Sequence, residues 1–174
     1  MICGFHALLH VGELTEPDQI AKELFVKTSL HNTLKLLPDI FSYHLPYHKG
    51  DWFFQGNIIM ICLIPVSPQC PVACMTWYVK LRDARFLLEL WLASSGDHLL
   101  YSWVVSCLHS TLYEEVGGHS LHSGGMTSLT LAGVSDNMIQ SMGHWASDMF
   151  QIYIWKHPVL LHALLHNEST ITTS

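Results

Sequence analysis

Positive charge is what this 174-residue chain has least of. It contains 8 lysines and arginines against 14 aspartates and glutamates, and its formal net charge is −6. Charged residues make up 13% of the chain, whereas ordinary soluble domains contain about 25%. Most of the deficit is arginine, because Arg82 and Arg85 are the only two. A protein that binds DNA unaided neutralises phosphates with Lys and Arg, so this composition argues against such binding.

Long apolar runs and paired-cysteine motifs are also missing. The longest apolar run, 58–64, is much shorter than the roughly 20 residues that a transmembrane helix needs. The first ten residues have neither the basic start nor the apolar core of a signal peptide. The 5 cysteines form no CxxC and leave one over in any pairing. We therefore expect no disulfide framework, no membrane partner and a reducing compartment.

The chain is long enough, and at 49% hydrophobic residues apolar enough, for one domain with a real core. Two strands, 40–48 and 57–64, flank the turn formers of KGDWFFQGN and predict an antiparallel hairpin. Apolar periodicity predicts helices elsewhere, while 18–38 is ambiguous. The fold class is thus mainly α with a small antiparallel β-sheet (α+β). We expect helices over 2–11, 72–85 and 102–116. A fourth helix should end at Gly133, with Gly124 and Gly125 just before it or at its start. A fifth should begin at Ser135 or Asp136, and a sixth should carry Tyr153.

Five short motifs follow one another along nearly the whole chain. In order they are HVGEL with His10 and Glu13, YHKGD with Lys49, HSLH with His119 and His122, MGHW with His144, and QIYI with Tyr153. Each motif is weak by itself, but their order and spacing are specific. The chain resembles the catalytic domain of tyrosine recombinases, the phage-integrase family, and most closely those of fungal mobile elements. That resemblance implies the tyrosine recombinase catalytic-domain fold.

The resemblance also implies a chemistry. Tyr153 would attack a DNA phosphodiester to give a 3′-phosphotyrosine and a free 5′-hydroxyl, and reversal would rejoin strands without metal or other cofactor. Lys49 would protonate the leaving oxygen, His119 would handle the tyrosine proton, and His144 would donate to the phosphate. The implied partners are double-stranded DNA and possible further recombinase subunits, with no small-molecule substrate. A fungal origin would place the protein in the nucleus.

Two departures from the family pattern bear on activity. His10 and His122 stand where the family has arginines. A histidine is mostly neutral at pH 7 and lacks the forked, permanent charge of a guanidinium. Loss of one oxyanion donor costs about 10²–10³ in rate, so we expect strand cleavage and rejoining to be impaired or lost. The first motif also begins at residue 10, so we expect residues 1–174 to be an N-terminally truncated catalytic domain without the family's DNA-clamping domain.

A single cause explains the arginine deficit and the 13 histidines. Single-base transitions in CG-type arginine codons give histidine, cysteine or tryptophan. Besides His10 and His122, candidate replaced positions are Trp52, Cys107, His109 and Trp155. Restoring all six would raise the net charge from −6 to zero. The hypothesis is a decayed copy of a mobile-element recombinase.

Other interpretations stay open. The chain could be a non-catalytic DNA-binding or inert relic, in which Tyr153 and Lys49 are ordinary surface residues and His119 caps a helix. It could also be a histidine-rich metal-binding protein, because His44 and His48 are four residues apart, as are 162 and 166. However, the first pair lies in an expected strand and no HExxH motif is present, so we assign no metal ligand.

Overall fold

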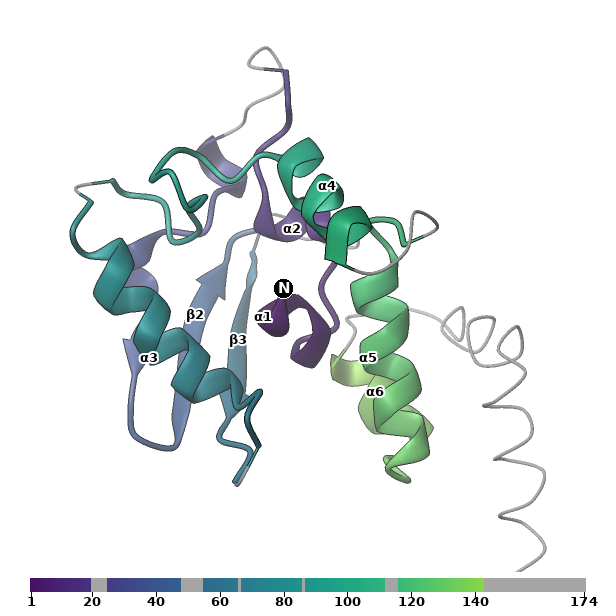
Figure 1. Cartoon of the computed structure of the whole chain (residues 1–174). Coiled ribbons are helices and arrows are strands. Elements are labelled where there is room, and N and C mark those ends of the chain that lie inside the picture. The colour runs from purple at the N-terminus through teal and green to yellow at the C-terminus, as the bar shows by residue number, and fades with distance from the viewer. Residues whose placement is uncertain (20–24, 48–54, 66, 86, 112–115, 143–174) are drawn as a thin grey trace, which may run out of the picture.

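The chain folds into a small sheet covered by helices (Figure 1). In this computed structural model the described residues are 1–19, 25–47, 55–65, 67–85, 87–111 and 116–142. Their helices are α1 (Ile2–His6), α2 (Val11–Leu14), α3 (Pro71–Arg82), α4 (Tyr101–Thr111), α5 (Ser120–Leu131) and α6 (Asp136–Met142), with short 3₁₀ turns η2 (Phe25–Lys27) and η3 (His31–Thr33). Their strands are β1 (Lys35–Leu36), β2 (Ile40–Leu45) and β3 (Asn57–Cys62).

The described strands form one antiparallel sheet in the order β1-β2-β3. The β2–β3 register runs from Ile40 opposite Cys62 to Leu45 opposite Asn57, so the predicted hairpin is confirmed with slightly shorter strands. Side chains alternate between faces with a period of two. Phe41 and Tyr43 are therefore buried on the face that α3 and the N-terminal segment cover.

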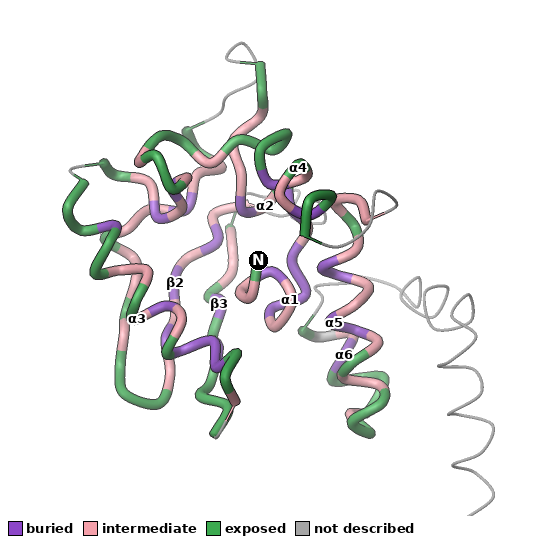
Figure 2. Tube along the Cα trace, in the orientation of Figure 1, coloured by how far each residue is buried: buried purple, intermediate pink, exposed green. Residues whose placement is uncertain are grey.

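The N-terminal segment differs from the single helix predicted over 2–11. It contains two short helices, and Leu8 between them has a left-handed backbone with φ of 53°. The side chains around this break enter three separate hydrophobic clusters: Leu9 joins the sheet and α3, Leu8 joins α5 and α6, and Val11 joins α4 and α5. One straight helix could not reach all three. Figure 2 shows this segment at the centre of the fold, with buried stretches between residues of intermediate burial.

Helix α5 contains the second difference, because Gly124 and Gly125 lie inside it rather than at its start. A Cβ on Gly125 would lie 2.1 Å from the carbonyl oxygen of Phe5 and 2.8 Å from Cδ2 of Leu8. The glycine therefore allows α1 to pack directly on α5. The expected stop at Gly133 is confirmed, since α5 ends at Leu131 and Gly133 has φ of 76°, and α6 begins at Asp136 as expected.

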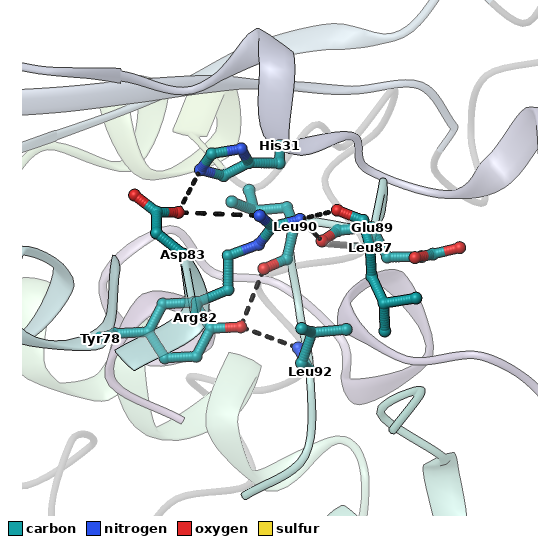
Figure 3. A network of polar contacts seen from close by, with 8 residues as sticks. All are labelled: His31, Tyr78, Arg82, Asp83, Leu87, Glu89, Leu90 and Leu92. Carbon is teal, nitrogen blue, oxygen red and sulfur yellow. Dashed lines mark hydrogen bonds and ion pairs between the residues drawn. The ribbon is translucent and has the colours of Figure 1, made fainter. Parts of the chain in front are cut away.

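Helix α3 is tied to the segment that follows it by a polar network (Figure 3). The buried Arg82 guanidinium donates to the carbonyl oxygens of Leu87 and Glu89. The Tyr78 hydroxyl donates to the Leu90 carbonyl at 2.8 Å and accepts from the Leu92 amide at 2.7 Å. With these four hydrogen bonds the two side chains fix the loop to α3. One of the chain's two arginines is thereby used for structure.

Candidate functional site

The backbone of His10 is held rigidly at the start of α2. His10 is the N-cap residue of α2, and its amide donates to Oε2 of Glu13 at 2.8 Å. Glu13 is the third residue of the helix, so the pair forms a capping box. On either side, Leu9 and Val11 are 0% and 1% exposed. Between these two anchors, the His10 side chain meets the two histidines at the start of α5.

His119 is the N-cap residue of α5 and His122 lies in its first turn, and a separation of three residues puts their side chains on one face. The His10 and His122 rings stack with centroids 4.2 Å apart and planes 9° apart. The His119 ring meets His10 edge-on, with centroids 4.9 Å apart, and their Nδ1 atoms are 3.1 Å apart. We call these three residues the histidine cluster.

His122 forms the base of the histidine cluster. It is 2% exposed, and its Nδ1 donates to the carbonyl oxygen of Leu8. Leu8 adopts the left-handed conformation, which costs a side-chain-bearing residue about 1–2 kcal/mol. The burial of the Leu8 side chain against α5 and α6 offsets this strain. The strained residue thus fixes the orientation of the His122 ring, on which His10 lies.

His10 and His119 form part of the wall of a cleft of about 650 Å³, whereas His122 lies behind it. The cleft walls also carry carboxylates that are held in place by hydrogen bonds. Oε1 of Glu16 accepts from the Thr28 hydroxyl at 2.6 Å, and Asp18 accepts from the amide of Ser102 at 3.1 Å. Hydrogen bonds from Ser102 lower the pKa of Asp18 below its usual value. The full lining is His10, Gly12, Glu13, Thr15, Glu16, Pro17, Asp18, Gln19, Lys27, Tyr47, Tyr101, Gly118 and His119.

Lys27 is the one lysine or arginine among these lining residues. Its Nζ lies 3.9 Å from the centroid of the Tyr47 ring, a cation–π contact. Neither arginine lines the cleft: Arg82 is buried in the network at α3, and the Arg85 guanidinium lies against Gly96. The described cleft therefore combines three carboxylates, one lysine and two imidazoles. That charge balance is unfavourable for an anion while the histidines are neutral.

The structure brings together three of the six predicted site residues. His10 and His119 are in contact across 109 sequence positions, and His122 joins them. Lys49, His144 and Tyr153 lie outside the described residues, so their convergence with the cluster stays a prediction. Sequence reasoning missed Glu16, Asp18 and Lys27 as lining residues, because the stretch between the HVGEL and YHKGD motifs contains no motif. Within the described ranges no three His, Cys, Asp or Glu residues are grouped to hold a metal ion, and no helix is long and apolar enough to cross a membrane.

Comparison with known proteins gives a match in structure alone. No family model and no curated protein matches the chain. The XerA recombinase superimposes with a TM-score of 0.62 at 17% identity, covering 95% of this chain and 57% of that one. The XerH site-specific recombinase bound to its difH substrate gives 0.55 at 13% identity for the post-cleavage complex and 0.53 at 12% for the pre-cleavage complex. These cover 97% and 98% of this chain and 46% and 47% of those chains.

The expected architecture is therefore confirmed at the level of fold. The chain has a mixed helical fold with a small antiparallel sheet, and it shares this arrangement with recombinases. It spans about half the length of these structures.

Proposed function

We propose that this chain is the core of a tyrosine-recombinase catalytic domain that binds duplex DNA, and that its strand cleavage through Tyr153 is impaired or lost. The observation that carries the proposal is the histidine cluster. The two positions assigned to the family's arginines, His10 and His122, are stacked against each other, and His119 contacts His10. Two forked donors placed side by side are what a single phosphodiester requires. The XerH structures, which hold a DNA substrate before and after cleavage, support DNA as the ligand.

In the proposed reaction the Tyr153 oxygen attacks the phosphorus and the bond from phosphorus to the 5′ oxygen breaks. His119 takes the tyrosine proton, and Lys49 gives a proton to the 5′ oxygen. His144 donates to a non-bridging oxygen. The two adjacent arginine positions would carry the remaining negative charge, and this is where the chain departs from the family.

The impairment follows from what the two histidines can offer. His10 shares its Nδ1 with His119, and His122 uses its Nδ1 on the Leu8 carbonyl. An imidazole has only two ring nitrogens, and these contacts engage one on each ring, whereas a guanidinium presents a fork of donors. The three carboxylates of the cleft add repulsion. We further propose that the chain derives from a fungal mobile element and acts, if at all, in the nucleus, because the motif order resembles that group.

The test uses the full chain and a nicked duplex, in which cleavage releases a short strand and traps any phosphotyrosine. We expect the duplex to bind with an affinity that falls steeply with salt, and we expect no more covalent adduct than Tyr153→Phe gives. An adduct well above that blank would show that histidine substitutes for arginine and would refute the impairment. Failure to bind duplex DNA even at low salt would refute the proposal in favour of an inert relic.

A further inference from the structure

The contact between His10 and His119 constrains their protonation. An Nδ1 to Nδ1 distance of 3.1 Å is a hydrogen bond that holds one proton, because one nitrogen must donate and the other accept. The pair can keep this bond with both rings neutral or with one ring charged. With both rings protonated, two N–H groups would point at each other, and the bond must open. The Nδ1–H of each imidazolium would then point away from the other ring.

The charged groups around the pair decide what such opening does. Glu13 faces the pair from α2, Glu16 and Asp18 from the segment after it, and Lys27 from η2. His122 faces it from α5, and the hydroxyl-bearing rings of Tyr47 and Tyr101 complete the lining. Together these groups set the charge of the cleft before and after the pair opens.

While both imidazoles are neutral, three carboxylates outweigh Lys27 and the cleft repels an anion. After both rings gain a proton, the cleft holds three positive groups and three negative ones. All three carboxylates already accept hydrogen bonds, from the His10 amide, the Thr28 hydroxyl and the Ser102 amide. The two imidazolium rings are then the donors released into the cleft.

We infer that the His10–His119 pair is a proton gate: the cleft takes up a tetrahedral oxyanion, such as a DNA phosphodiester, when both rings are protonated, and excludes it when they share a proton. The inference rests on the proposed function for the identity of the oxyanion. An arginine at position 10 could not act in this way, because a guanidinium stays charged at every physiological pH.

The experiment titrates the full chain with sulfate, which is tetrahedral and keeps its charge between about pH 5.5 and pH 8, the range in which histidine titrates. We expect affinity about tenfold or more higher at the acid end, since one hydrogen bond to a charged group contributes that much. His119→Gln and His10→Gln should each reduce the pH dependence to the background that the remaining histidines produce. His119 is exposed, so its variant tests the idea even if the His10 variant folds poorly, as circular dichroism would show.

The matched control is His109→Gln, which removes an exposed histidine of α4 outside the cleft. It is needed because protonating all 13 histidines would turn a net charge of −6 into one of +7, which favours any anion. The control should keep the pH dependence. Sulfate affinity that is independent of pH, or a pH dependence in His119→Gln as large as in the control, would overturn the inference. Duplex DNA titrated in the same buffers separates the two proposals: gated sulfate binding without DNA binding at any pH leaves the gate intact and refutes the proposed function.

Discussion

Replacement of Gly125 by alanine tests whether the close contact between α1 and α5 builds the site. The added Cβ would lie 2.1 Å from the Phe5 carbonyl oxygen and 3.1 Å from its carbonyl carbon, and backbone cannot rotate away as a side chain can. Overpacking costs up to about 3 kcal/mol, while alanine gains about 1 kcal/mol over glycine inside a helix. We therefore expect Gly125→Ala to lower the free energy of unfolding by about 2 kcal/mol.

The neighbouring Gly124 provides the matched control within the same helix. Its Cβ would lie 3.3 Å from Cε2 of the Phe5 ring, which can shift by a few tenths of an ångström. Gly124→Ala should therefore stabilise the chain by up to about 1 kcal/mol. Urea unfolding followed by circular dichroism measures both variants. If Gly125→Ala is as stable as Gly124→Ala, then α1 does not pack on α5 as described, and the position of Leu8 under His122 loses its explanation.

Three further predictions concern stability and association. Tyr78→Phe removes a hydroxyl that bonds the Leu90 carbonyl and the Leu92 amide, so urea unfolding should show a loss of about 1–3 kcal/mol; an unchanged midpoint would contradict the loop-fixing role. Burial lowers the pKa of His6 below its usual value of 6.5, so the unfolded chain binds more protons between the two values and stability should fall as pH drops through this window. His6→Gln should flatten that slope, and an identical slope would refute the assignment. Ile58 is 63% exposed on the outer face of β3, so Ile58→Lys should reduce self-association in sedimentation measurements without loss of stability. The control Ile59→Lys, at a position 4% exposed, should unfold the chain. If Ile58→Lys associates as much as the unmodified chain, this face is not responsible for the association.

The parts of the fold that local chemistry controls could be predicted from the sequence. Turn formers between two alternating strands identified the β2–β3 hairpin, and Gly133 marked the end of α5 because its left-handed backbone suits glycine. The break at Leu8 could not be predicted, since an apolar run looks the same whether it enters one core or three. Gly125 was misplaced for a related reason: its role is set by Phe5, which is far from it in sequence.

In the candidate site, too, the sequence predicted what depends on local motifs and missed what depends on packing between distant segments. The motifs identified His10, His119 and His122 as candidate site residues, although nothing in their spacing could give the stacking or the shared Nδ1 contact. Lys27 and Asp18 belong to a stretch without periodicity, and only the packing of η2 and α4 brings them to the cleft. The acidity of the cleft is therefore a property of the fold, and it adds a second obstacle to anion binding besides the missing arginines.

The central claim is that His10 and His122 occupy two coupled arginine positions of a phosphate site, and restoration of both arginines tests it most directly. Because the two side chains are in contact, His10→Arg and His122→Arg together should return far more covalent capture of nicked DNA on Tyr153 than the sum of the single variants. The same positions changed to lysine, which has charge without the fork, should return much less. Tyr153→Phe in the double variant is the blank. A double variant that binds DNA and still forms no adduct would contradict the account, because Lys49, His119 or Tyr153 would then be wrongly assigned.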